Sequence, residues 1–170
     1  MKAVARVRAE RAGEAEAIGA LVSAAFLGHP HSAGTEAAIV RALRAAGALS
    51  LSLVAECDER LIGHIAFSPI TVEGRAGAWF GLGPLAVAPP CQRQGVGAEL
   101  VRHGLQQLQE RGAAGCVVLG DPAYYGRFGF RAVPGLVYPG PPPELFMALA
   151  WKGPVPQGVV AYHSGFEARD

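Results

Sequence analysis

The chain has 170 residues, enough for one domain with a real hydrophobic core. Hydrophobic residues make up 51% and charged residues 17%, a balance that argues against long disordered segments. The formal net charge of +1 argues against a protein that binds duplex DNA through massed lysines and arginines. The sequence has no N-terminal signal core and no apolar run near the roughly 18 residues of a membrane span, so we expect a cytoplasmic protein without a membrane partner.

The first third of the chain predicts one short strand and two helices. Residues 2–8 alternate in character as a strand does, and residues 13–27 carry apolar residues on one helical face. A second helix begins after a cap at Ser32 or Thr35 and ends at Gly47. The apolar face of the first helix consists of Ile18, Leu21, Val22, Ala25 and Phe26.

A block of three strands follows, at residues 49–54, 61–72 and 79–87, joined by short turns. Short turns between strands favour antiparallel pairing. Gly83-Pro84 interrupts the third strand, and we expect a bulge there because proline lacks the N–H and glycine accommodates irregular backbone.

The last part of the chain predicts a long helix that Gly112 ends, then a short buried strand at 116–119. A short helix follows around 123–128, and two strands lie near 146–151 and 158–162. No internal repeat or linker is visible. The order of elements therefore indicates a single domain that contains both helices and strands.

Cysteines and histidines give no sign of a metal site. Cys57, Cys91 and Cys116 form no Cys-x-x-Cys pair, so we expect neither a bound metal nor a redox motif. Cys116 lies in an apolar run and is expected in the core. The two histidines of residues 28–31 are interpreted as surface residues of a loop.

The most specific feature is a glycine turn between a predicted strand and a predicted helix, with the sequence Gln92-Arg93-Gln94-Gly95-Val96-Gly97-Ala98. Free backbone N–H groups and a partial positive charge at a helix N-terminus bind phosphate. A Walker A loop is excluded because no Lys-Ser or Lys-Thr follows the glycines. A dinucleotide fingerprint is disfavoured because Leu100 stands where the third glycine belongs.

The pattern Gln92-x-x-Gly95-x-Gly97 resembles the Q/R-x-x-G-x-G/A motif of the GNAT superfamily of acyl-CoA-dependent N-acetyltransferases. Residues 120–130 resemble the family's segment after its fifth strand, where a tyrosine precedes a closing Gly-Phe by four residues. Residues 53–56, 63–69 and 83–87 are similar to one bacterial branch of predicted N-acetyltransferases. The resemblance covers roughly residues 3 to 166.

The resemblance implies a GNAT fold over residues 1–170. This α/β fold has a mixed, mostly antiparallel sheet of about six or seven strands with about four flanking helices, splayed at the strand before the turn. It also implies that acetyl-CoA is the acyl donor. The expected diphosphate site consists of Gln92, Arg93, Gln94, Gly95, Val96, Gly97 and Ala98.

Further site residues follow from the same resemblance. The exposed backbone of Leu85, Ala86 and Val87 is expected to pair with the pantetheine arm, and an N–H near Leu85 to polarise the thioester. Tyr125 is expected to protonate the leaving thiolate, with Tyr124 as the competing candidate. Adjacent side chains on a helix diverge by about 100°, so only one of the two should face the cofactor. A mere packing role for both remains the alternative.

The roles of the other polar residues stay open. Asp121 either caps the short helix or faces the cofactor, and the cap is the preferred interpretation. The general base is left open, because a water chain also serves. The candidates are Glu36, Glu56, His64, Glu73 and Glu144.

The expected activity is transfer of acetyl from acetyl-CoA to a primary amine, directly within a ternary complex. We expect the acceptor to be a small-molecule or peptide amine rather than nucleic acid. The residues that select the acceptor are expected at residues 26–35, near Phe80 and in the final hairpin loops. We expect the protein to be a monomer or a homodimer. Two alternatives remain. One is transfer of a larger acyl group, with room beside Gly81 and Ala86. The other is a non-catalytic acyl-CoA sensor or interaction module.

Overall fold

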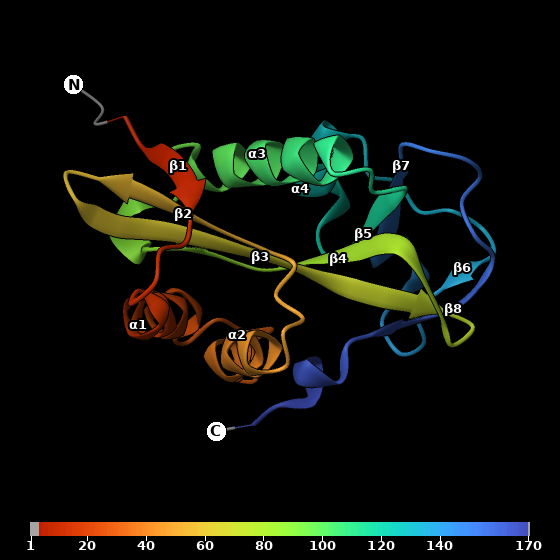
Figure 1. Ribbon diagram of the computed structural model, residues 1–170, viewed down its shortest axis with the longest axis horizontal. Coiled ribbons are helices and arrows are strands. Elements are labelled where there is room, and N and C mark those ends of the chain that lie inside the picture. The colour runs from red at the N-terminus through yellow and green to blue at the C-terminus, as the bar shows by residue number, and fades with distance from the viewer. Residues whose placement is uncertain (1–3, 170) are drawn as a thin grey trace.

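A computed structural model describes residues 4–169, and in this range a central sheet is covered by helices on both faces (Figure 1). The strand order is β1-β2-β3-β4-β5-β7, with β8 beside β3 and β6 beside β8. The β4–β5 and β6–β8 pairs are parallel and the others antiparallel. The strands are β1 (Arg6–Ala9), β2 (Leu51–Cys57), β3 (Arg60–Val72), β4 (Arg75–Val87), β5 (Gly115–Leu119), β6 (Leu136–Val137), β7 (Phe146–Ala150) and β8 (Gly158–Tyr162).

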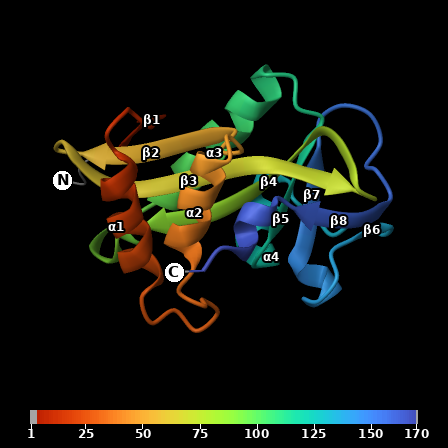
Figure 2. The same ribbon diagram turned by 60° about the horizontal axis from the view of Figure 1, so that its bottom comes forward.

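Helices α1 (Ala15–Phe26) and α2 (Glu36–Ala45) lie on one face of the sheet, and α3 (Val96–Glu110) and α4 (Pro122–Tyr125) lie on the other (Figures 1 and 2). Short 3-10 turns complete the chain at η1 (Pro89–Cys91), η2 (Gly126–Phe128), η3 (Pro143–Leu145) and η4 (Ser164–Glu167). None of the helices in residues 4–169 has the length and apolar character needed to cross a membrane.

The predicted order of elements and the mixed, mostly antiparallel sheet are confirmed. The described residues hold eight strands, more than expected, because the two-residue β6 carries too little pattern to be detected. Part of the strand predicted at residues 2–8 lies outside the described residues, and β1 begins at Arg6. Asp121 caps α4, with its carboxylate accepting from the Ala123 N–H at 2.9 Å.

The predicted cap of α2 is wrong in one respect. Thr35 stands at the N-cap position, but no side chain makes a cap hydrogen bond there. Ser32 instead donates to the Glu36 carboxylate and accepts from the Gly34 N–H. The loop before α2 is therefore closed by Ser32 from outside the helix.

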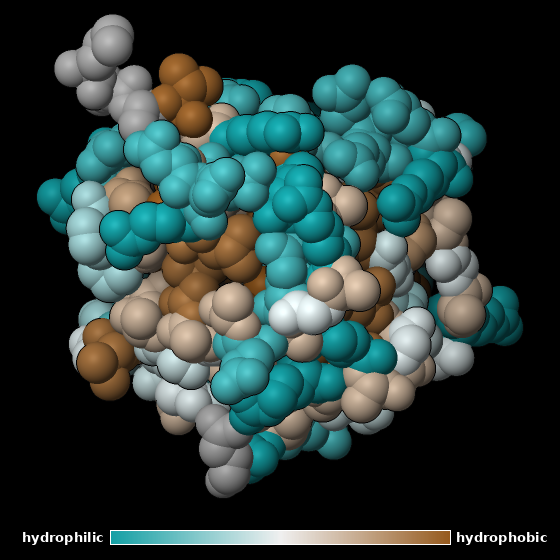
Figure 3. Space-filling model, turned by 60° about the vertical axis from the view of Figure 1, so that its left-hand side comes forward, coloured by the Kyte–Doolittle hydropathy of each residue, from teal (hydrophilic) through white to brown (hydrophobic). Residues whose placement is uncertain are grey.

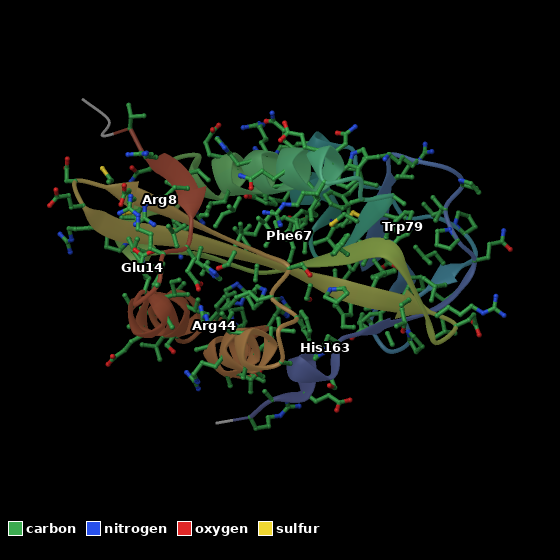
Figure 4. All side chains as sticks on the ribbon, in the orientation of Figure 1. Arg8, Glu14, Arg44, Phe67, Trp79 and His163 are labelled. Atoms are coloured by element: carbon green, nitrogen blue, oxygen red, sulfur yellow. The ribbon has the colours of Figure 1, made fainter. Side chains whose placement is uncertain are left out.

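Phe67 lies at the centre of the core on the α3 face, fully buried on β3 (Figure 4). The nearest atom of its ring lies only 2.3 Å from the position that a Cβ at residue 104 of α3, a glycine, would take. The glycine lets helix and sheet approach closely. Cys116 is also buried in this cluster, as predicted.

A cluster of ion pairs joins strands β1 and β2 to the start of helix α1. Arg8 of β1 bonds to Glu14, just before α1, at 2.9 and 2.8 Å, and to Glu56 of β2 at 3.0 Å. Figure 4 shows Arg8 and Glu14 directed toward one another. The hydrogen bond from Arg8 lowers the pKa of Glu14 to about 2.

Strands β4 and β5 separate after a short parallel contact, as the splayed sheet requires. Residues 79–81 of β4 pair with residues 115–117 of β5, and no later residue of β4 pairs with β5 among those described. The register with β3 shifts at Gly83-Pro84, where two residues of β4 stand opposite Ala66. Gly83 has φ +132°, which side chains rarely tolerate, so the predicted bulge is confirmed.

Candidate functional site

The glycine turn joins η1 to α3 and leaves the N-terminus of that helix open. Gly95 is the N-cap residue with φ +87°, and no side chain makes a cap hydrogen bond there. Residues 92–95 are exposed. The first N–H groups of a helix have no partner within it, so this end offers donors and a partial positive charge to an anion.

The two glutamines of the turn fix its shape. The Gln92 side chain donates to the Val87 carbonyl at 3.0 Å, and the Gln94 side chain donates to the Pro90 carbonyl at 3.2 Å. Each thereby ties the turn to the segment that precedes it. Arg93 is exposed at the tip with φ +62°, so its guanidinium projects from a left-handed backbone position.

The end of β4 presents backbone groups on the side that β5 leaves uncovered. The Ala88 N–H donates to the Ile62 carbonyl at 2.8 Å, which marks that pair as hydrogen-bonded. Because such pairs alternate in an antiparallel ladder, Ala86 bonds to β3, whereas Leu85 and Val87 direct their N–H and carbonyl groups away from β3. Of the three predicted residues, Leu85 and Val87 therefore form the open edge.

Gly97, in the first turn of α3, lies between this open edge and Tyr124 of α4. A Cβ at residue 97 would lie 2.7 Å from the Tyr124 hydroxyl oxygen, 3.6 Å from Val87 Cγ2 and 3.8 Å from Leu85 Cδ2. The guanidinium carbon of Arg127 lies 4.5 Å from the centre of the Tyr124 ring. Burial raises the pKa of Tyr124.

Tyr125 occupies a different environment from its neighbour. Its ring packs on Gly120, where a Cβ would lie 2.5 Å from Cε2, and its centroid is 6.0 Å from that of Phe130. Burial, with the nearby Tyr124 and Cys116, raises the pKa of Tyr125 well above its usual range, so the phenol stays protonated. The two tyrosine rings are 83° apart in plane, and the one against the glycine turn is Tyr124.

Most candidate bases are already engaged in hydrogen bonds. Glu56 accepts from Arg8, which lowers its pKa, and Glu73 accepts from the Val159 N–H at 2.7 Å. Glu36 accepts from Ser32, and Glu144 is exposed on η3. His64 is fully buried on β3.

A groove of about 770 Å³ adjoins the outer side of the turn, and its lining includes Ile62, Cys91 and Gln94. Figure 3 looks onto this side of the molecule and shows hydrophobic surface between hydrophilic margins. Neither tyrosine of α4 lines the groove.

Two contacts near the separated strands were not predicted. The Tyr162 ring of β8 packs on Gly81, where a Cβ would lie 2.4 Å from Cε1, and burial raises its pKa. Ser52 links His64 to Glu10 through side-chain hydrogen bonds. A glycine inside a strand often marks a place where another group approaches the backbone closely, so Gly81 was the only signal in the sequence for the contact with Tyr162.

Comparison with known proteins agrees with this geometry. The model of the Acetyltransferase (GNAT) family matches residues 17–130. The uncharacterized N-acetyltransferase YhbS of Escherichia coli K12 is 44% identical over 126 residues, which cover 74% of this chain and 72% of YhbS.

Two crystal structures have a similar fold. A GNAT family acetyltransferase from Brucella melitensis, in complex with acetyl-CoA, is 46% identical with a TM-score of 0.87, covering 97% of this chain and 99% of its own. The structure of YhbS from Escherichia coli in complex with CoA is 37% identical with a TM-score of 0.88, covering 98% and 94%. The chain belongs to the GNAT family of acetyltransferases.

Proposed function

We propose that this protein transfers an acetyl group from acetyl-CoA to a primary amine within a ternary complex. The observation that carries the proposal is the open edge of β4 at Leu85 and Val87, directly beside the uncapped N-terminus of α3. Similar structures, at 46% and 37% identity, hold acetyl-CoA and CoA.

The donor's diphosphate would lie on the N–H groups at the start of α3, with residues 92–98 around it. Gly95 and Gly97 permit close backbone approach there. The amides of the pantetheine arm would pair with the outward carbonyl of Leu85 and the outward N–H of Val87, as an added strand does, which leaves the outward N–H of Leu85 for the thioester. The Val87 carbonyl already accepts from Gln92.

In the transfer step, the amine nitrogen forms a bond to the thioester carbonyl carbon, and the carbonyl oxygen takes the electron pair. The outward N–H of Leu85 stabilises that oxygen. The C–S bond then breaks, and Tyr125 gives its phenolic proton to the sulfur. The proton that the amine loses finally reaches solvent, and the Tyr125 phenolate regains a proton from solvent, so the products are the amide and the CoA thiol.

The test has two stages. Isothermal titration with acetyl-CoA must show binding, and titration without binding overturns the proposal. Release of free thiol is then measured against a panel of amino acids, polyamines and N-terminal peptides. Turnover with any amine supports the transferase, whereas tight binding without turnover indicates the acyl-CoA sensor instead.

The same assay separates acetyl from larger acyl donors. Propionyl-CoA and butyryl-CoA replace acetyl-CoA with the amine that reacts fastest. A higher kcat/KM with a longer acyl group would show that the space beside Gly81 and Ala86 accepts it, although Tyr162 already fills the place of a Gly81 side chain.

A further inference from the structure

His64 combines complete burial with an unused polar atom. It lies on β3 between Val54 of β2 and Ala86 of β4, with no exposed surface. Its Nε2 lies 2.8 Å from the Ser52 hydroxyl, whereas its Nδ1 is buried without a hydrogen-bond partner among residues 4–169. An unpaired buried polar atom destabilises a fold, so this one needs an explanation.

The hydrogen bonds around His64 determine which ring nitrogen carries the proton. The Ser52 hydroxyl donates to Glu10 at 2.8 Å, and Glu10 is held by Arg44 at 2.7 and 3.2 Å. A hydroxyl has one proton, so Ser52 accepts from Nε2–H of His64. The lone pair of the neutral ring is then on Nδ1.

The ring lies one strand away from the proposed transfer site. His64 stands directly opposite Ala86, between the two residues of the open edge, and side chains so paired have Cβ atoms about 5 Å apart. Ala86 packs with residues of α1 and α2, on the face opposite Tyr125. The β4 side chain beside the imidazole on that face is the single methyl group of Ala86.

We propose that His64 is the general base of the transfer and receives, through a water molecule at Nδ1, the proton that the attacking amine loses. This inference rests on the proposed function. The N–H bond of the tetrahedral adduct breaks as an O–H bond of the water forms, and the water passes a proton to Nδ1. The imidazolium returns that proton to solvent by the same route after the amide leaves, while Tyr125 separately supplies the thiol proton.

Ser52 and Glu10 are positioning residues in this scheme. They hold the Nε2–H tautomer, and the Glu10 carboxylate stabilises the imidazolium that forms. Arg44 of α2 opposes that charge, α1 presents the apolar Ile18 and Val22, and exposed Arg41 reaches over Gly19.

Burial lowers the pKa of His64 to about 4, so the lone pair is available at neutral pH. A base this weak acts on the nitrogen of the tetrahedral adduct, which is more acidic than the parent ammonium ion.

The test compares His64→Gln, Ser52→Ala and, as the control, His103→Gln, which changes a half-exposed histidine of α3. Acetyl-CoA titration checks that each variant keeps its donor site. With the fastest amine of the panel, we expect His64→Gln to lower kcat by about 100-fold or more with KM for acetyl-CoA unchanged. Ser52→Ala should lower kcat and shift the pH profile, because it frees the tautomer, and His103→Gln should match the wild type.

Unchanged kcat and pH profile in His64→Gln would overturn the inference and leave His64 a packing residue. A second measurement does not depend on turnover. Nitrogen NMR of the imidazole, in protein loaded with acetyl-CoA, should show Nε2–H and an unprotonated Nδ1, and a proton on Nδ1 would contradict the scheme. If wild-type protein binds acetyl-CoA but no amine reacts, the proposed function fails while this measurement still decides the state of His64.

Discussion

Gly97 and Tyr124 come together beside the end of β4, so closely that a Cβ at residue 97 would lie 2.7 Å from the tyrosine oxygen. The contact joins the glycine turn of α3 to the tyrosine segment of α4, which are far apart in the sequence. The neighbouring Tyr125 lies deeper, against Gly120 and Phe130. The two phenols thus lie in different environments, one beside Gly97 and one further inside.

Gly97→Ala should weaken acetyl-CoA binding because the new methyl group displaces the Tyr124 hydroxyl at the edge of the proposed donor site. The hydroxyl is the end of a side chain that can shift, so the cost to folding should be small. Tyr124→Phe removes the oxygen that the methyl group meets, so Gly97→Ala should cost less in that background, with a coupling of at least about 0.5 kcal/mol. Titration of the single and double variants measures this.

The control for this cycle is Gly126→Ala, since a Cβ there meets nothing within 4 Å. It should leave the affinity for acetyl-CoA unchanged. Additive effects of Gly97→Ala and Tyr124→Phe would contradict a direct contact between the two residues.

Tyr125→Phe should lower kcat by about 100-fold or more, because general acid catalysis contributes on that scale, and leave acetyl-CoA affinity near that of the wild type. Burial raises the pKa of Tyr125 and keeps the phenol protonated. Titration of this group should therefore cause no loss of wild-type activity at pH values up to the ordinary pKa of tyrosine. Thiol release across a pH series is the measurement. A larger loss of kcat in Tyr124→Phe than in Tyr125→Phe would reverse the two roles.

Local chemistry explains which features were predictable from the sequence. The bulge at Gly83-Pro84, the Asp121 cap and the glycine turn are each determined by residues adjacent in the chain, and the structure has all three. Contacts between distant segments were not predictable. Tyr124 meets Gly97, and Ser52 joins His64 to Glu10, only because the sheet and α4 bring them together.

The open edge of β4 illustrates the same limit at finer scale. The sequence indicates the strand, but which backbone groups face outward depends on its pairing with β3. The bond from Ala88 to Ile62 sets that alternation and turns Ala86 toward β3. No residue type signals this choice, because backbone groups are the same in every residue.

Two helical glycines should respond oppositely to alanine. A Cβ at Gly19 of α1 would meet only the Arg41 guanidinium, at 3.8 Å, so Gly19→Ala should stabilise the protein by about 0.5–1 kcal/mol. Gly104 of α3 lies on the buried Phe67 ring, where the Cβ would be 2.3 Å from Cε2. Overpacking of about 1–3 kcal/mol should outweigh the helix gain, and Gly104→Ala should destabilise. Denaturant unfolding of the pair measures this, and equal effects would contradict the close packing of α3 on the sheet.

The buried His64 should make stability depend on pH in a defined interval. Its pKa is about 4 when folded and about 6.5 when unfolded, because burial disfavours the charged ring. Above pH 6.5 both states are neutral and the group has no effect. As the pH falls toward 4, the unfolded chain binds a proton that the folded protein excludes, so stability is lost, by about 3 kcal/mol at pH 4.

His64→Gln is the matched variant, since glutamine stays uncharged and its amide can still donate to Ser52. The difference in unfolding free energy between wild type and variant should therefore shrink or change sign as the pH falls through this interval. The stability from the Glu14 ion pair is lost between about pH 4.5 and 2, because the bond from Arg8 holds the folded pKa of Glu14 near 2, and that loss is common to both proteins. Parallel curves for the two proteins between pH 6.5 and 4 would show that His64 takes up its proton in the folded state as easily as in the unfolded chain, and that its burial does not exclude charge.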